Sequence, residues 1–338
     1  MSSSDRTWRA LVLSGGGAKG EFQLGALECL RDLKNWEFDF LTGVSVGALN
    51  VAILAQHEQL SEGVGKLTAL WDSIRANRDV YTGGSIAIGA LLSLFTRSKI
   101  AKDAIYDSAP LASLIQRNVR WADFKHAFSV GVTSLTDGMP YTITNLGPVL
   151  EAKPRNGRTL SLNLEAEGNG SIPGRIASFI LASASMPLLF PPVEIYGHKF
   201  VDGGVRDVTP LSSAFDAAKA AVSAGWHGDM EILVISTAPA ALPVVPTKDL
   251  DSGREIIGRS LEIMVHEILT NDVDLATALN ELNYAQQRFI RVPVRHIRPD
   301  EDLNLGTLDF NDQVGRKRVR GLGYATMARY LEADRIAA

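Results

Sequence analysis

Two short turns near the N-terminus contain residue types that can do chemistry. The first reads Gly15-Gly16-Gly17-Ala18-Lys19-Gly20 and follows the apolar run Ala10–Leu13. The second reads Gly43-Val44-Ser45-Val46-Gly47 and places a serine between two glycines. A serine hydroxyl is a weak nucleophile until a neighbouring base activates it. The chemistry of this chain therefore depends on what the first turn binds and on which base reaches Ser45.

Three kinds of ligand site use a glycine-rich turn between a strand and a helix. The first turn satisfies the G-x-G-x-x-G pattern of dinucleotide-binding proteins, and Asp39 follows at the distance of a ribose-binding carboxylate. It fails the phosphate-loop pattern, because Lys19 is followed by Gly20 and not by serine or threonine. Its backbone N–H groups could instead form an oxyanion hole at the start of a helix. A tight turn without a ligand is the fourth alternative, and the turn alone does not decide between them.

The second turn favours the oxyanion hole. G-x-S-x-G between a strand and a helix is the context of a nucleophile elbow, in which glycines let the chain bend sharply and present the serine. In a parallel sheet both turns fall at the carboxyl ends of neighbouring strands, where α/β proteins build their sites. The dinucleotide alternative is weakened, because Asp39 lies inside the strand that leads to Ser45. The pattern therefore predicts a serine nucleophile beside an oxyanion hole.

The base is less evident from the sequence. None of the six histidines lies in a motif, although His198 shares a predicted strand with the carboxylate candidate Asp202. Asp202 is followed by Gly203 and Gly204, so it can approach another backbone closely. An ordinary Asp-Gly turn would have the same sequence, and it stays an alternative at this point.

Four blocks in this order resemble the patatin-like phospholipase family. They are Leu13–Gly20, Gly43–Gly47, Ala182-Ser183-Ala184-Ser185-Met186-Pro187 and Asp202-Gly203-Gly204, and Leu308-Asp309-Phe310-Asn311 resembles a weaker C-terminal block of bacterial members. The resemblance implies an α/β fold, a three-layer α/β/α sandwich with a mostly parallel central sheet and a nucleophile elbow after an early strand. It also implies a catalytic dyad, with Ser45 as the nucleophile and Asp202 as the general base, and no cofactor or metal.

The resemblance assigns the remaining site residues by position. It places the oxyanion hole at Gly15, Gly16, Gly17 and Ala18, with Gly16 and Gly17 as the N–H donors, and gives supporting roles to Lys19, Gly20, Gly43, Gly47, Gly203 and Gly204. Two positions depart from the family pattern. Lys19 stands where many relatives have arginine, and Val208 stands where many have asparagine, which questions the support of the loop after Gly204.

The activity that the resemblance implies is hydrolysis of carboxylic esters of phospholipids or lysophospholipids through an acyl-enzyme. The expected partners are a lipid ester and the surface of a membrane or micelle. Two alternatives remain at this stage. One is a dinucleotide-binding oxidoreductase, and the other is a non-catalytic regulatory protein on the same fold.

Composition supports a globular chain with a large core. The 338 residues are 46% hydrophobic and 21% charged, with a formal net charge of −4. An acidic balance gives no sign of the markedly basic face that duplex nucleic acid needs, and a single cysteine, Cys29, excludes an internal disulfide. The patterns predict a strand over 9–14, helices over 21–33 and 48–55, a hairpin around Asp137-Gly138, a buried strand over 231–236 and one or two helices over 254–282. We expect one catalytic domain over residues 8–335, with the motifs in 10–210 and a helical portion over 250–335.

Targeting and membrane signals are weak. The first apolar run is shorter than a signal-peptide core, and no stretch reaches the length of a spanning helix, so we expect a cytoplasmic protein. Specialised secretion would leave no such signal, and the sequence leaves the oligomeric state open. The apolar segment 85–102, with Arg97, Lys99 and Lys102, reads as either a lid or a core helix. Arg316-Lys317-Arg318 with Arg320 reads as either a headgroup contact or a solvated helix face.

Overall fold

A computed structural model describes residues 6–34, 36–83, 104–120, 123–146, 158–161, 172–251, 253–286 and 291–337. The segment 85–102, for which the sequence suggests a lid or a core helix, lies outside the described residues. Among the helices within those ranges, none combines the length and the apolar character needed to cross a membrane.

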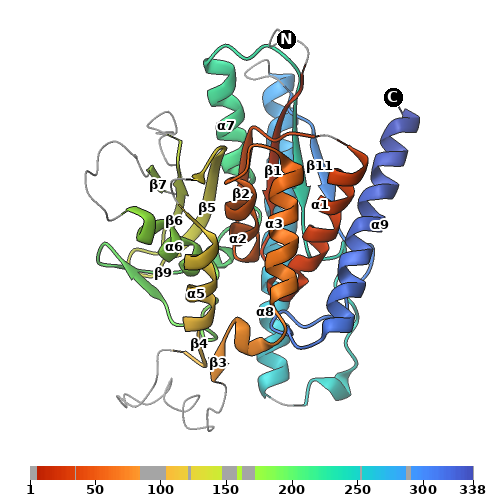
Figure 1. The fold of residues 1–338 in the computed structure, drawn as a ribbon. Helices are drawn as coiled ribbons and strands as arrows, with labels where there is room; N and C mark the ends of the chain where they lie inside the picture. The colour runs from red at the N-terminus through yellow and green to blue at the C-terminus, as the bar shows by residue number, and fades with distance from the viewer. Residues whose placement is uncertain are drawn as a thin grey trace.

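A central sheet contains strands from almost the whole length of the chain (Figure 1). Its order is β11 (Val294–Ile297), β10 (Met230–Ile235), β1 (Trp8–Leu13), β2 (Phe40–Gly43), β5 (Ala127–Ser134), β6 (Pro140–Thr144) and β7 (Arg158–Ser161). From β11 to β5 all neighbours are parallel, β5 and β6 are antiparallel, and β6 and β7 are again parallel. The strand β9 (His198–Asp202) pairs antiparallel with β5 and with β8 (Val193–Ile195), and β3 (Thr82–Gly83) and β4 (Tyr106–Asp107) form a separate pair.

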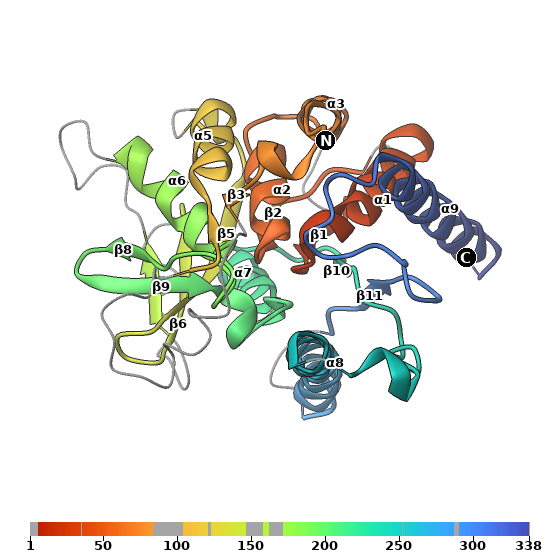
Figure 2. The same ribbon diagram turned by 90° about the horizontal axis from the view of Figure 1, so that it is seen from below.

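Helices cover both faces of this sheet, which gives a three-layer α/β/α sandwich (Figure 2). One layer contains α1 (Glu21–Leu33), α2 (Val46–Leu54), α3 (Leu60–Ser73), α5 (Ala109–Asn118), α6 (Ile172–Ser183) and α9 (Gln313–Ala337). The opposite layer contains α7 (Leu211–Ser223) and α8 (Gly253–Ala285). The mostly parallel sheet and its flanking helices confirm the fold class that the sequence predicts.

The strand β1 shows why the sheet needs helices on both faces. Leu11 and Leu13 point into the core on the side of α1 and α2, whereas Ala10 and Val12 point into the core beside α7, and all four are fully buried. A strand that is apolar on both faces is typical of a parallel sheet with two helical layers. The glycine-rich turn therefore follows a strand of which every residue except Arg9 is buried.

The last helix, α9, packs against α1 at two glycines. A Cβ added to Gly25 would lie 1.8 Å from the carbonyl oxygen of Arg320, and a Cβ added to Gly323 would lie 2.0 Å from that of Phe22. The two backbones therefore touch, and any side chain at either position would push the helices apart. This contact holds the C-terminal helix against the first helix after the glycine-rich turn.

Two arginines of α9, Arg316 and Arg320, neither lie on a solvated helix face nor are free to contact a lipid headgroup. Arg316 is 3% exposed and forms a buried ion pair with Glu21 at 2.7 Å. Arg320 forms an ion pair with Asp72 at 2.9 Å and a second one with Glu28. The headgroup contact and the solvated helix face are therefore both wrong for these two arginines, because they join α9 to α1 and α3.

Most predicted elements occur within a residue or two of their expected bounds. The helix over 21–33 is α1, and the hairpin around Asp137-Gly138 is β5–β6, with Gly138 at a φ of 71°. The buried strand over 231–236 is β10, and every residue of β10 is buried. The region over 254–282, for which the sequence allows one or two helices, is a single helix, α8.

Candidate active site

Ser45 lies at the sharp turn between β2 and α2. Its backbone has a φ of 57° and a ψ of −125°, a conformation that few residues other than glycine adopt. The flanking glycines make this turn sterically feasible. A Cβ on Gly43 would lie 2.4 Å from the backbone of Gly47, and one on Gly47 would lie 2.3 Å from the carbonyl oxygen of Leu13. The geometry of the turn is that of a nucleophile elbow.

A second serine holds this strained turn in place. The N–H of Ser45 donates to the Oγ of Ser183 at 2.9 Å, and that hydroxyl donates in turn to the carbonyl oxygen of Gly131 at 2.7 Å. Ser183 is fully buried at the end of α6. The sequence identifies the block from Ala182 to Pro187 only through the family resemblance, and it gives no sign that Ser183 supports Ser45.

Asp202 lies at the end of β9 and faces Ser45. Its N–H donates to the carbonyl oxygen of Ser185 at 2.9 Å, and its Oδ1 accepts from the N–H of Gly204 at 2.8 Å. The Ser45 side chain lies close enough to the Asp202 carboxylate to lower its pKa. Gly203 fits against β5, since a Cβ there would lie 2.5 Å from the carbonyl oxygen of Gly131. The structure thus brings the two predicted catalytic residues together.

Burial sets the proton affinity of Asp202. The side chain is 5% exposed, and this desolvation raises its pKa to about 6, against the opposing effect of the Gly204 N–H and of the Ser45 side chain. A carboxylate with a pKa near the working pH is a better general base than one near 4. Asp202 is therefore a buried carboxylate beside Ser45 whose pKa is closer to neutral pH than that of an exposed aspartate.

The glycine-rich turn lies directly against Ser45. A Cβ added to Gly15 would lie 3.2 Å from the Cβ of Ser45 and 3.9 Å from its Oγ. The N–H of Gly15 donates to Val208 at 3.4 Å, and that of Ala18 donates to Thr307 at 2.8 Å. Within the described residues, the N–H groups of Gly16 and Gly17 have no hydrogen-bond acceptor. The described part of the chain therefore leaves these two backbone donors unused.

Two threonines far along the chain shape the glycine-rich turn. A Cβ on Gly16 would lie 2.2 Å from the Oγ1 of Thr237, and one on Gly17, whose φ is 56°, would lie 2.1 Å from the carbonyl oxygen of Thr307. The Thr237 hydroxyl also donates to the carbonyl oxygen of Gly15 at 2.7 Å. The sequence does not predict either threonine as part of the site, because neither lies in a block that contains a candidate catalytic residue.

The remaining residues of the motif have packing roles in the structure. Lys19 closes the turn through its backbone, since its N–H donates to the carbonyl oxygen of Gly16 at 3.1 Å. Gly20 packs against the start of α2 and against α3, since a Cβ there would lie 2.7 Å from the Cγ2 of Val46 and 2.8 Å from the ring of Trp71. Both positions therefore fix the angle at which the glycine-rich turn enters α1.

Histidine takes no part in this arrangement. His198 lies at the opposite end of β9 from Asp202, and its Nδ1 contacts the Oγ of Ser134 at 3.3 Å. All six histidines lie in the described part of the chain, and none of them hydrogen-bonds to Ser45 or Asp202. The same described residues include no group of three His, Cys, Asp or Glu side chains placed to hold a metal ion.

An acidic pair supports the loop after Gly204. Asp272 of α8 accepts from the N–H of Val208 at 3.0 Å and from that of Thr209 at 3.4 Å. Asp207 lies beside Asp272, and its burial and the Asp272 charge raise the pKa of Asp207. The side chain of Val208 also contacts the glycine-rich turn, 3.9 Å from a Cβ built on Gly15. The support that the sequence leaves in doubt at Val208 therefore comes from α8.

The region that contains the two turns and Asp202 matches a known protein family. The family model for patatin-like phospholipase matches residues 11–215. No curated protein matches the chain. Several solved structures do, and the three described next each align with almost the whole of this chain.

These three solved structures belong to proteins longer than the aligned region. VipD from Legionella pneumophila is 16% identical, with a TM-score of 0.45 and coverage of 98% of this chain and 68% of VipD. The type III effector protein ExoU is 14% identical, with a TM-score of 0.36 and coverage of 98% and 53%. Human GIVD cytosolic phospholipase A2 in complex with methyl gamma-linolenyl fluorophosphonate is 10% identical, with a TM-score of 0.36 and coverage of 98% and 59%. The chain therefore spans only part of each of these proteins.

Proposed function

Because the chain belongs to the patatin-like phospholipase family, we propose that it hydrolyses carboxylic esters of phospholipids or lysophospholipids with a Ser45–Asp202 dyad. One observation carries the dyad. The buried carboxylate of Asp202, whose pKa is raised to about 6, lies close enough to the Ser45 side chain for that side chain to act on its pKa. Such a pair provides both a nucleophile and the base that activates it.

In the first step the Ser45 hydroxyl attacks the ester carbonyl carbon. Asp202 accepts the hydroxyl proton as the new C–O bond forms, and the carbonyl oxygen becomes an oxyanion. The N–H groups of Gly16 and Gly17 donate to that oxygen, with Gly15 and Ala18 holding the turn in shape. Collapse of the tetrahedral intermediate breaks the bond to the leaving alcohol, which takes the proton from the protonated carboxyl of Asp202, and leaves an acyl-Ser45 ester.

In the second step water replaces the alcohol. Asp202 accepts a proton from the water as its oxygen attacks the acyl carbon, and the same two N–H groups stabilise the second oxyanion. The fatty acid leaves, and the Ser45 oxygen regains a proton from the protonated carboxyl of Asp202. Since backbone donors stabilise the developing charge in both steps, we propose a reaction that uses neither a metal nor a cofactor.

The catalytic unit that we propose is one domain over residues 8–335. The strands β10 and β11 lie beyond the matched region and extend the same sheet as β1. Thr237 and Thr307 also lie beyond that region, and both contact the glycine-rich turn. The C-terminal portion over 250–335 is thus expected to be necessary for activity, because it shapes the proposed oxyanion hole.

The test is release of fatty acid from micelles of phosphatidylcholine and of lysophosphatidylcholine. Ser45→Ala and Asp202→Asn are each expected to lower kcat/KM by on the order of 10³-fold or more. Asp216→Asn on α7 is the matched control, because this acid lies on the protein surface and pairs only with Lys219 among the described residues. Full activity in either dyad variant would overturn the assignment, and loss of activity with a chelator would overturn the metal-free mechanism.

A further inference from the structure

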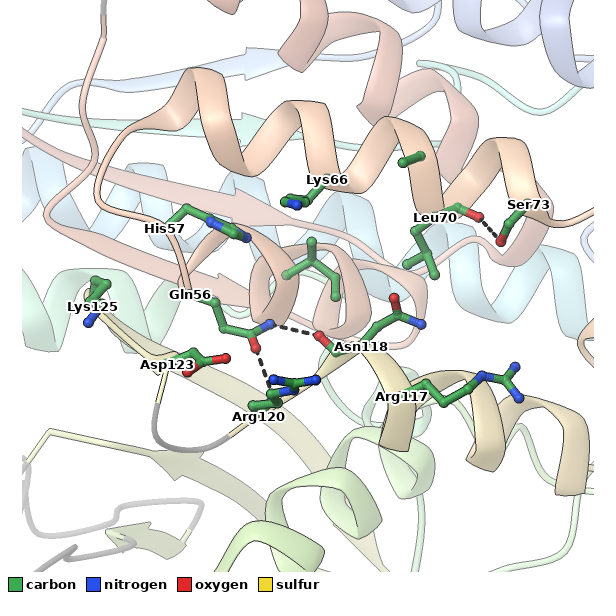
Figure 3. A pocket seen from close by; sticks show the side chains of 12 residues that line it. Gln56, His57, Lys66, Leu70, Ser73, Arg117, Asn118, Arg120, Asp123 and Lys125 are labelled. Carbon is green, nitrogen blue, oxygen red and sulfur yellow. Dashed lines mark hydrogen bonds between the residues drawn. The ribbon is translucent and has the colours of Figure 1, made fainter.

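A basic cavity lies at the end of α2 that is opposite to Ser45 (Figure 3). Its volume is about 500 Å³, and it opens between α3, α5 and the chain that leads into β5. Four cationic side chains line it, and the one acid among its lining residues is Asp123. The four are Lys66, Arg117, Arg120 and Lys125. This local excess of positive charge stands out on a chain with a formal net charge of −4.

Asp123 is the one carboxylate among the described residues that line the cavity, and it forms no ion pair with the four cationic side chains. Among the described residues, Lys66, Arg117, Arg120 and Lys125 form no ion pair within 4.0 Å. Arg320, by contrast, is paired with acids of α1 and α3. A recess with one sign of charge concentrates the electrostatic potential and attracts ions of the opposite sign.

The backbone that carries two of these cations is anchored to α2. The buried Gln56 side chain donates to the carbonyl oxygen of Asn118 at 3.1 Å and accepts from the N–H of Arg120 at 2.8 Å. The N–H of Lys125 donates to the carbonyl oxygen of Ala55 at 2.8 Å. Figure 3 shows the Gln56 side chain among the lining residues, with its two hydrogen bonds running to Asn118 and to Arg120. The cations are therefore attached to a fixed frame rather than to an independent loop.

We propose that this cavity binds a ligand that carries two or more phosphate groups. Arginine donates in a bidentate manner to phosphate oxygens, and lysine provides a compact charge for the same groups. A ligand with a single carboxylate would balance only one of the four cations. Each phosphate monoester carries roughly 1.5 to 2 negative charges, so a ligand with two phosphates would balance most of them. The chemistry fits the headgroup of a polyphosphoinositide or a free inositol polyphosphate. This inference does not depend on the proposed lipid hydrolysis.

The direct test is calorimetric titration with inositol hexakisphosphate. The double variant Lys66→Gln/Lys125→Gln removes two charges from the cavity, and Lys199→Gln/Lys248→Gln removes two exposed charges elsewhere. We expect the cavity variant to bind on the order of tenfold more weakly for each lysine removed, and the control to bind within about twofold of the native chain. Equal weakening in both variants, or no binding to the native chain, would overturn the proposal.

Two further measurements separate the sources of the phosphate and the two activities. Cosedimentation with phosphatidylcholine vesicles that contain phosphatidylinositol bisphosphate, competed by free inositol hexakisphosphate, identifies a lipid headgroup. Binding of the free ligand without vesicle binding identifies a soluble one, and either result supports the site if the cavity variant loses it. Ser45→Ala should bind as tightly as the native chain, so failure of the proposed hydrolysis would leave the binding result intact.

Discussion

Removal of the Ser183 hydroxyl should damage the site without touching either dyad residue. In Ser183→Ala, the N–H of Ser45 and the carbonyl oxygen of Gly131 lose their partner in a buried setting. Each unpaired buried group costs about 1–3 kcal/mol. Because some of this cost is relieved by relaxation of the turn, we expect the free energy of unfolding to fall by about 2–4 kcal/mol.

The same variant should lose activity because the backbone of Ser45 is strained. A φ of 57° at a non-glycine residue stores about 1–3 kcal/mol, which the surrounding contacts must offset. Without the Ser183 hydroxyl the turn can relax and move the Ser45 Oγ away from Asp202. A misplacement of about 1 Å can cost on the order of 10²-fold in rate. We therefore expect a fall in kcat of that order, with little change in KM.

Ser185→Ala is the matched control in the same block. Its hydroxyl donates to the carbonyl oxygen of Leu181 at 2.8 Å, and the bond from Asp202 goes to its backbone, which alanine keeps. We expect a stability loss of about 1 kcal/mol and a nearly native kcat. The measurements are urea denaturation and steady-state hydrolysis of a short-chain ester. If Ser183→Ala kept its kcat, or if both variants lost equally, Ser183 would not support the nucleophile.

Three other predictions follow from the same contacts. Gly17→Ala should abolish most hydrolysis, because its Cβ would collide with the carbonyl of Thr307. Gly138→Ala is the control, since Gly138 has a φ of 71° but lies in open space, and it should cost only about 1–2 kcal/mol of stability and no activity. Asp202 has a raised pKa of about 6, so its contribution to stability is present below about pH 4 and is lost as the pH rises through 6. Asp202→Asn should therefore raise the thermal midpoint at pH 8, with a gain of up to about 3 kcal/mol in unfolding free energy, while hydrolysis disappears; a lower midpoint would contradict the cause assigned to that pKa. Burial and the charge of Asp272 also raise the pKa of Asp207, so its ionisation, like that of Asp202, lowers the free energy of unfolding as the pH rises. In Asp207→Asn the thermal midpoint should therefore fall less on the alkaline side, as measured by thermal melts across pH.

The sequence predicts the parts of the site that depend on local geometry. Ser45 and the glycines around it are identifiable because a sharp strand-to-helix turn requires those residue types within a few positions. Asp202 is harder to identify, since Asp-Gly-Gly is also an ordinary turn, and the family resemblance was needed to assign it. The order of the sheet then explains its position, because β9 pairs antiparallel with β5 and ends beside the elbow.

The supporting residues could not be predicted, because their roles arise from contacts between distant segments. Ser183, Thr237 and Thr307 are common residue types, and their positions follow only from how α6, β10 and the chain before α9 meet the two turns. The position of Arg316 differs from both sequence interpretations for the same reason. A run of basic residues on a helix is usually solvated, and nothing local indicates that Glu21, at the start of α1, will lie against Arg316 in the core.

Labelling with a fluorophosphonate tests the central claim most directly, because this reagent reacts with an activated serine and mass mapping locates the adduct. We expect one adduct, on Ser45, whose rate of formation rises with pH through about 6, the pKa of Asp202. The adduct should be absent in Ser45→Ala and should form far more slowly in Asp202→Asn. An adduct on another serine, or an unchanged rate in Asp202→Asn, would contradict the Ser45–Asp202 dyad.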